Sequence, residues 1–326
     1  MKVLVIGYGS MGKRRIRLLK NLIGNVEIIC VDSNSERLHQ IDEADLKSHD
    51  NIAAAINEKP DIAFVCTSPG NHAEIILMLV NAGINVFTEL NLVDTNYDKI
   101  IKTAKEKNVT VFMSSTLLYN RQIAKIDELV KQNDKPLTYI YHIGQYLPDW
   151  HSWESYKDFF IGKKETNGVR EILAIQLPWL INTFGKISSV KVNSQKCTDL
   201  DIDFNDSIVA NFTHENGNIG VFVADVVSRK AVTYLEIIGE DIHLFWHGHN
   251  DDLTVYNTKT KKIETIYAYN NVEHTDGYAD NIIENQYSDE IADFLDVVYK
   301  GTIPRYSIEK DKYTLSIIDS IERSAK

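Results

Sequence analysis

The motif Gly-Tyr-Gly-Ser-Met-Gly at residues 7–12 constrains this chain more than any other feature of its sequence. It directly follows the apolar run Val-Leu-Val-Ile and leads into a stretch whose apolar residues recur at helical spacing. A buried strand, a tight glycine loop and a helix form the first unit of a parallel sheet. In such a loop Gly7 permits the turn, Gly9 lets the backbone approach a pyrophosphate, and Gly12 allows the helix to pack on the strand.

Asp32 strengthens this interpretation because of its spacing. It follows the second predicted strand, Glu27–Val31, and lies twenty residues after Gly12. A carboxylate at that point can accept hydrogen bonds from both ribose hydroxyls of NAD and would repel the extra phosphate of NADP. The helix N-terminus beside it offers amide donors to the pyrophosphate. The sequence therefore predicts NAD as the cofactor, with NADP the less favoured alternative.

The rest of the chain predicts an α/β protein with two domains. The first third alternates short apolar runs with helical patterns, as in a doubly wound parallel sheet of the Rossmann type. After about residue 120, consecutive hairpin-like strands predict an α+β domain with a large, open, mixed and mainly antiparallel sheet. We expect a dinucleotide-binding domain over residues 1–120 and a substrate and oligomerisation domain over 121–326. The C-terminal helices of the second domain are expected to pack back on the first.

Composition excludes several classes of partner. The formal net charge of -11 disfavours nucleic acid and anionic membrane surfaces. Three scattered cysteines give no disulfide framework or zinc site, and no stretch approaches 18 apolar residues, so we expect a cytoplasmic protein outside the membrane. His243, His247 and His249 would share one face of a strand, but no carboxylate is spaced to complete a metal site. No metal is expected.

Further polar groups follow other strands of the first domain. The segment Thr67–His72 and Glu89 come where two strands end, at the edge of a parallel sheet that binds ligands. Ser68 or Asn71 could instead only cap the following helix, and Glu89 could be a surface carboxylate. The residues that we expect at the cofactor are Gly7, Tyr8, Gly9, Ser10, Met11, Gly12, Asp32, Thr67, Ser68, Pro69, Asn71, His72 and Glu89.

Four cations crowd the first turns of the opening helix, where the helix dipole disfavours positive charge. They are Lys13, Arg14, Arg15 and Arg17. Two interpretations stay open: a solvated basic face, or contacts with cofactor phosphates or an acidic substrate.

At these motifs the chain resembles the Gfo/Idh/MocA family of NAD(P)-dependent oxidoreductases, which act mainly on sugars, inositols and related polyols. The resemblance rests on GYGSMGKR, DIAFVCTSPGNH, NAGINVFTELNL and ENQYSDEIADFLDVVYKGTIP. The segment QYLPDWHSWESYKDFFIGKKE further resembles a branch associated with surface polysaccharides and acidic sugars. The resemblance implies hydride transfer between the nicotinamide and a hydroxyl or ketone of a sugar or nucleotide-sugar. Separately, the exposed face of the predicted open sheet is rich in Val, Ile, Phe and Tyr, so we expect a homo-oligomer, dimer or tetramer, through that face.

The departures from the family pattern concern catalysis. The family's Glu-Lys-Pro reads Glu89, Leu90 and Asn91 here, and leucine cannot move a proton. The family's histidine aligns with Gln176, which cannot act as an acid or base near neutral pH. The partner aspartate then falls on Ile172, or on Glu171 after a slip of one residue.

If the protein is catalytic, another side chain must exchange the proton. The aromatic segment Tyr146–Glu165, which the family layout places over the cofactor, supplies His151, Tyr156, Lys163 and Lys164. We name Tyr156, Lys164 and Gln176 as catalytic candidates. The alternative is a catalytically lapsed protein that binds NAD and a sugar as a sensor or partner.

Overall fold

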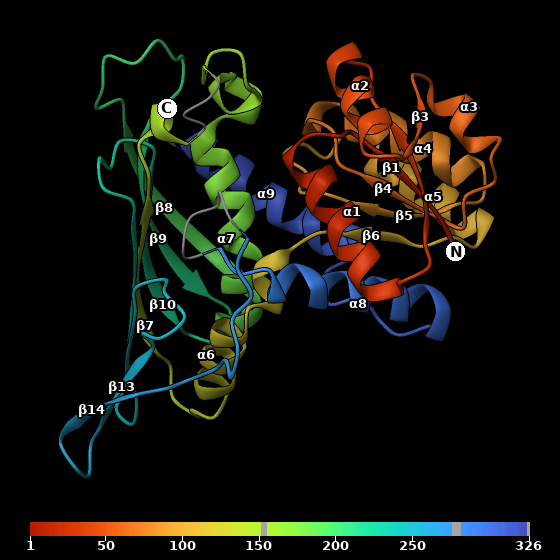
Figure 1. Cartoon of the computed structure of the whole chain (residues 1–326). Helices are drawn as coiled ribbons and strands as arrows, with labels where there is room; N and C mark the ends of the chain where they lie inside the picture. The colour runs from red at the N-terminus through yellow and green to blue at the C-terminus, as the bar shows by residue number, and fades with distance from the viewer. Residues whose placement is uncertain (151–154, 276–281, 325–326) are drawn as a thin grey trace. The chain divides into compact units, whose positions relative to one another are not determined.

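The computed structural model describes residues 1–150, 155–275 and 282–324, drawn in colour in Figure 1. These residues divide into two compact units. Unit 1 comprises Met1–Thr116 and Tyr287–Lys312, and unit 2 comprises Leu117–Gln286 and Tyr313–Lys326. Residues 287–312, which the sequence assigned to the second domain, therefore cluster with the N-terminal residues. The domain division at residue 120 stays a prediction.

Unit 1 is built on a six-stranded sheet in the order β3-β2-β1-β4-β5-β6, in which every recorded pair is parallel. This is the strand order of a Rossmann fold, so the predicted doubly wound sheet is confirmed. The strands are β1 (Lys2–Ile6), β2 (Glu27–Val31), β3 (Lys47–His49), β4 (Ile62–Val65), β5 (Asn85–Thr88) and β6 (Val111–Met113). Strand β3 was not predicted, because a polar edge strand of three residues carries no hydrophobic pattern.

The helices of unit 1 connect its strands or pack on its sheet (Figure 1). They are α1 (Ser10–Ile23), α2 (Ser35–Glu43), α3 (Ile52–Ile56), η1 (Pro69–Asn71), α4 (His72–Asn81), α5 (Tyr97–Lys107), α8 (Asn285–Lys300) and the first part of α9 (Ile308–Ser324). Phe294 of α8 contacts three stacked rings of the sheet, from Phe64, Phe87 and Phe112. These buried rings join α8 to β4, β5 and β6, although 182 to 230 positions separate Phe294 from the three rings.

Unit 2 contains an eight-stranded sheet in the order β14-β13-β12-β11-β7-β10-β9-β8. The pair β7 and β10 is parallel and the other recorded pairs are antiparallel, so the predicted mixed, mainly antiparallel sheet is confirmed. The strands are β7 (Thr138–Gly144), β8 (Ile187–Gln195), β9 (Ser207–His214), β10 (Ile219–Asp225), β11 (Val232–Ile238), β12 (His243–Trp246), β13 (Thr254–Asn257) and β14 (Lys262–Thr265).

One face of this sheet is covered by a helix and the other is not (Figure 1). The buried helix α7 (Gly168–Phe184) packs on the inner face, where Tyr141 contacts Trp179 edge to face. No helix of the described ranges covers the outer face, where Ile140, Ile219 and Ile238 are exposed. The remaining helical elements of unit 2 are η2 (Thr116–Tyr119), α6 (Arg121–Lys131), η3 (Leu147–Asp149), η4 (Phe160–Gly162) and η5 (Lys164–Thr166). No helix among the described residues is long and apolar enough to span a membrane.

Candidate dinucleotide-binding site

The glycine loop has the close approaches that its sequence predicted. Gly7 has φ +96°, and a Cβ built there would lie 2.7 Å from the backbone oxygen of Cys66. A Cβ on Gly12 would lie only 1.9 Å from the backbone oxygen of Gly7. At Gly9, in contrast, the nearest atom to an added Cβ belongs to Arg37, at 3.9 Å. The loop is therefore tightly packed on both sides of Gly9 and open at Gly9 itself.

The N-terminus of α1 adjoins this open position. Gly9 is the N-cap residue, no side chain caps the helix, and the first turn contains no acidic residue. The positive end of the helix dipole therefore has no acidic side chain of its own first turn beside it. Such a helix start is suited to a diphosphate.

Asp32 is held in place by backbone amides. Its carboxylate accepts hydrogen bonds from Tyr8 N at 2.8 Å and Asn34 N at 2.9 Å, and it is 7% exposed. Arg37 Nη1 lies 3.5 Å from the same carboxylate. The bond from Tyr8 connects Asp32 to the glycine loop, so the structure brings the two halves of the predicted motif together.

The loop after β4 is fixed by His72. Neither Ser68 nor Asn71 makes a side-chain capping bond, so the capping alternative is wrong. The buried ring of His72 instead contacts Thr67 O at 2.7 Å and the side-chain amide of Asn91. Burial lowers the pKa of His72, which favours the neutral ring. His72 therefore joins the ends of β4 and β5 and has a structural role that the sequence did not indicate.

Glu89 pairs with an arginine of α1. Its carboxylate accepts two hydrogen bonds from Arg15, one from Nε at 2.6 Å and one from Nη2 at 3.2 Å. Glu89 is buried, so the surface-carboxylate alternative is wrong. Its role as a cofactor contact stays a prediction. Both carboxylate oxygens of Glu89 already accept a hydrogen bond from Arg15, so a cofactor would have to share them.

A second buried carboxylate, Glu290 of α8, completes this cluster. It accepts hydrogen bonds from Arg15 at 2.7 Å, Ser114 Oγ at 3.0 Å and Ser115 N at 2.7 Å. Burial alone lowers the pKa of an arginine, but the carboxylates of Glu89 and Glu290 raise that of Arg15 above its ordinary value. Sequence reasoning missed Glu290, because nothing local distinguishes it from the other acids of its helix.

The cluster explains part of the basic crowding on α1. Arg14 and Arg15 are buried, so the solvated-face interpretation is wrong for both. Arg14 lies over the ring of Tyr287, 4.3 Å from its centroid, and Arg15 has Glu89 as its counter-ion. Lys13 donates to Gln40 Oε1 at 2.8 Å. The negative charges that compensate for placing Arg15 near the positive end of the helix dipole are therefore the carboxylates of Glu89 and Glu290.

Unit 2 contains the predicted catalytic residues. Gln176 is buried in α7, where its Oε1 accepts from Tyr141 Oη and Trp179 Nε1, each at 2.8 Å. Tyr156 Oη accepts from Asp201 N at 3.3 Å, and the exposed Lys164 lies 3.6 Å from Asp203. His151 lies outside the described residues.

Glu171 differs from these residues in its environment. It lies in the first turn of α7, one turn before Ile175 on the face of the helix that is least buried. No described residue pairs with or donates to its carboxylate, and burial raises its pKa to about 7.

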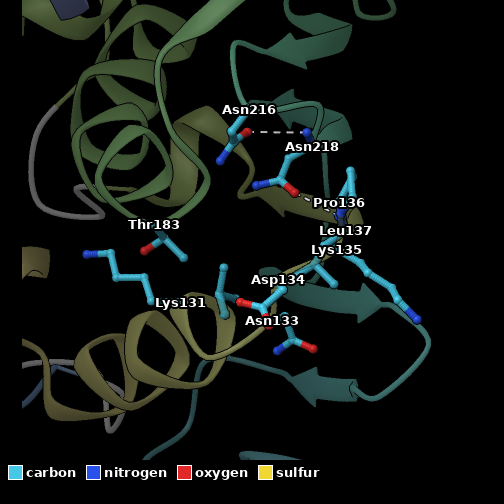
Figure 2. Close-up of a pocket in the computed structure, with 10 residues that line it drawn as sticks. Lys131, Asn133, Asp134, Lys135, Pro136, Leu137, Thr183, Asn216 and Asn218 are labelled. Carbon is cyan, nitrogen blue, oxygen red and sulfur yellow. Dashed lines mark hydrogen bonds between the residues drawn. The ribbon is translucent and has the colours of Figure 1, made fainter.

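Unit 2 also has a separate cavity of about 250 Å³ between the end of α6, the end of α7 and the turn before β10 (Figure 2). Its lining is mainly amide and charged side chains, among them Asn133, Asp134, Lys135, Asn216 and Asn218. None of the predicted site residues lines it.

The three-histidine hypothesis gains no support from the fold. Strand β12 ends at Trp246, so the alternation that would align His247 and His249 with His243 stops before them. His243 Nε2 contacts Glu236 Oε1 at 2.8 Å. No group of three or more candidate metal ligands occurs within the part of the chain that the structure describes.

The predicted cofactor residues of unit 1 all follow the carboxyl ends of β1, β2, β4 and β5, which lie at one edge of a parallel sheet. An edge of this kind, with a glycine loop and an acidic residue after the second strand, defines the class of dinucleotide-binding Rossmann domains. Comparison with known proteins agrees. Residues 1–115 match the Gfo/Idh/MocA oxidoreductase family, described as having an NAD-binding Rossmann fold. These residues are therefore similar to the NAD-binding Rossmann domains of that family.

Three known proteins match longer parts of the chain than this domain. Myo-inositol 2-dehydrogenase of Thermotoga maritima is 26% identical over 141 residues, which is 40% of this chain and 41% of that protein. An oxidoreductase from Agrobacterium radiobacter, solved with NAD+, L-tartaric acid and magnesium, has a TM-score of 0.86 at 13% identity and covers 100% of this chain and 96% of its own. Levoglucosan dehydrogenase, solved with NADH and L-sorbose, has a TM-score of 0.82 at 16% identity, with coverage of 100% and 96%. At these identities the two structures show a shared fold over the whole chain.

Proposed function

We propose that the protein is an NAD-dependent oxidoreductase of the Gfo/Idh/MocA family that acts on a hydroxyl or ketone of a sugar or nucleotide-sugar. The observation that carries the proposal is the open space at Gly9. On either side of it, Gly7 and Gly12 lie too close to backbone oxygens to carry a side chain. The Asp32 carboxylate, which accepts a hydrogen bond from Tyr8 N, lies beside this loop. The residues fit a dinucleotide, with the diphosphate at the start of α1 and the adenosine ribose at Asp32. NAD is the expected cofactor.

The substrate class rests on similarity. Relatives and structural neighbours include a myo-inositol 2-dehydrogenase and a levoglucosan dehydrogenase solved with a sugar. A role in surface-polysaccharide or acidic-sugar metabolism is a finer expectation, from the sequence of residues 145–165. We also propose a cytoplasmic location and a homo-oligomer.

A bound nicotinamide supplies hydride exchange, so this chain must supply the matched proton transfer at the substrate oxygen. We propose Glu171 for that step. A pKa of about 7 lets one carboxyl group both accept and release a proton near neutral pH. Its side chain is half-buried and has no recorded partner among the described residues, so no ion pair must break first. Catalytic roles for Tyr156, Lys164 and Gln176 stay predictions. Gln176 would have to contact the substrate while its side-chain oxygen accepts hydrogen bonds from Tyr141 and Trp179.

The test is a titration with NAD and NADH followed by turnover assays with neutral, amino and acidic sugars. We expect NAD binding and oxidation of at least one sugar, with kcat rising through about pH 7 as Glu171 loses its proton. Glu171→Gln should lower kcat about 100-fold and remove that rise, without weakening NAD binding. Glu128→Gln, on the exposed face of α6, is the control. Absence of cofactor binding would refute the whole proposal.

The alternative is a protein that binds NAD and a sugar without turnover. It is favoured by Leu90 at the position of the family's lysine and by the structural hydrogen bonds of Gln176. NAD binding with no turnover of any sugar would support it. Restoration is best attempted with Leu90→Lys alone, because Gln176→His would remove the acceptor of two buried donors.

A further inference from the structure

The cavity in unit 2 lies where two helices end (Figure 2). Helix α6 ends at Lys131 and α7 ends at Phe184, and residues of both last turns line the cavity. The negative ends of both helix dipoles therefore adjoin it, and they favour cations and hydrogen-bond donors. A volume of about 250 Å³ corresponds to roughly eight water molecules, which is the size of a monosaccharide.

The walls of this cavity are fixed by side-chain hydrogen bonds. Asn218 is 5% exposed; its side-chain oxygen accepts from Leu137 N at 2.7 Å, and its Nδ2 donates to Phe184 O at 3.0 Å. One buried amide therefore joins the chain before β7, the turn before β10 and the end of α7. Asp127 of α6 accepts from Asn182 Nδ2 of α7 at 3.1 Å, which connects the two helices. The cavity is therefore preformed, as small-molecule sites usually are.

The charged side chains of the lining differ in whether they are paired. Lys131 Nζ donates to Asp127 at 2.8 Å, and Lys135 pairs with Glu240. Asp134 also lines the cavity, but its carboxylate has no ionic partner among the described residues. It is therefore the uncompensated charge of the lining. Together with the two helix ends, this carboxylate favours a cationic ligand.

Thr183 supplies a buried hydroxyl. It is 5% exposed, and its Oγ1 has no hydrogen-bond partner among the described residues. A threonine in a helix has two accessible χ1 rotamers, so the hydroxyl can turn to a ligand without breaking a hydrogen bond. The side-chain oxygen of Asn216 accepts from Asn218 N at 3.3 Å, which leaves its Nδ2 for a ligand. Asn133 Nδ2 donates to Leu129 O at 2.7 Å, which leaves its side-chain oxygen.

We propose that this cavity binds a small hydroxylated amine of the amino-sugar class. Figure 2 shows Thr183, Asp134 and Asn216 on different sides of the cavity. The ammonium group pairs with Asp134, and the ligand hydroxyls exchange hydrogen bonds with Thr183, Asn133 and Asn216. An acidic sugar is excluded, because its carboxylate would meet Asp134 and two helix C-termini. The inference goes beyond the proposed function, since none of the predicted site residues lines the cavity.

The experiment is a ligand-observed NMR titration of the full chain at pH 6.5, where the amine of D-glucosamine is protonated. D-glucose and D-glucuronate are the comparators. We expect glucosamine to bind about threefold to fivefold more tightly than glucose, and glucuronate not to bind. Asp134→Asn should remove the preference for glucosamine and change the affinity for glucose by less than about twofold. Thr183→Val should weaken both sugars about threefold to tenfold. Thr103→Val, which removes a hydroxyl from α5, is the control.

Unfolding separates ligand binding from a structural role of the hydroxyl. Thr183→Val should not lower the midpoint of urea unfolding, because Oγ1 has no recorded hydrogen bond to lose. The inference is wrong if wild-type protein does not bind glucosamine, if glucuronate binds as tightly, or if neither cavity variant changes binding. The last outcome would place the sugar at another site, such as that of the proposed substrate. Titration of the same samples with NAD tests the proposed function separately, and its failure would leave the cavity result unchanged.

Discussion

Individual residues of unit 1 meet very different constraints even where the residue type is the same. Gly12 faces a carbonyl oxygen at a distance that excludes any side chain, whereas Gly70 has open space around it. Glu89 and Glu290 can both be buried because each forms an ion pair with the guanidinium of Arg15. Close packing and burial, more than residue type, decide what each position tolerates.

Gly12→Ala should lower the free energy of unfolding by about 2–3 kcal/mol and weaken NAD binding, because α1 must move away from Gly7. Gly70→Ala is the matched control, and we expect a change within about 0.5 kcal/mol. Urea unfolding monitored by circular dichroism measures both. Equal stability of the two variants would contradict the packing argument.

Asp311 is a buried carboxyl group with two phenol donors. Tyr97 Oη and Tyr306 Oη donate to it, the latter at 2.9 Å, and burial raises its pKa to about 6. In the unfolded chain its pKa is ordinary, so the folded protein holds a proton that the unfolded chain has lost between about pH 4 and 6. The free energy of unfolding should therefore fall as pH rises through this window and stay lower above it.

Asp311→Asn should remove this contribution. We expect the loss of stability between pH 4.5 and 7.5 to be about 2 kcal/mol smaller in the variant than in wild-type protein. Asp98→Asn, at an exposed position of α5, should leave the pH dependence unchanged. Urea unfolding at the two pH values gives the comparison. An identical pH dependence in Asp311→Asn would show that Asp311 titrates normally.

Among the elements, α6 has an N-cap residue, Asn120, that also connects the helix to a distant part of unit 2. The side-chain oxygen of Asn120 accepts from Gln122 N at 2.9 Å and Ile123 N at 3.1 Å. Its Nδ2 donates to Gln286 Oε1 at 3.1 Å. One buried side chain therefore caps α6 and ties it to a residue more than 160 positions later.

Asn120→Ala should lower the free energy of unfolding by about 2 kcal/mol, since it removes a cap and leaves buried polar groups unpaired. Asn120→Asp keeps the capping oxygens and loses only the bond to Gln286, so we expect a smaller loss. Chemical unfolding distinguishes the two contributions. If both variants are equally destabilised, the cap contributes nothing measurable.

At the scale of the whole molecule, the outer face of the unit 2 sheet is an exposed apolar surface outside the proposed site. Ile219 and Ile238 both pair across Thr138, and Ile140 pairs with Val221, so these side chains form one patch. Ile219 is 49% exposed. A second copy of the chain would cover an apolar face of this kind.

Sedimentation velocity should show a dimer or tetramer of the wild-type chain. Ile140→Glu should give monomers, because it places a second carboxylate beside Glu236, the residue that pairs with position 140, and the added charge must be desolvated in an interface. Ser316→Glu, at an exposed position of α9, is the control, and circular dichroism checks the fold. A wild-type monomer, or an unchanged assembly in Ile140→Glu, would exclude this face as the interface.

The sequence by itself determined the strand, the glycine loop and the helix of unit 1, together with the change to hairpin-like strands in unit 2. These features depend on local periodicity and on glycine geometry, which neighbouring residues fix among themselves. It also placed the predicted cofactor residues at the strand ends of one sheet edge.

The tertiary structure alone decided which partners the buried charges have. Arg15 meets Glu89 and Glu290 across 74 and 275 positions, and His72 meets Asn91 across 19. Arg37 adjoins Gly9 only because α2 follows β2 at the same edge. Hydrogen bonds and ion pairs act over a few ångströms in space, and the sequence gives no distance between residues that only the folded chain brings together.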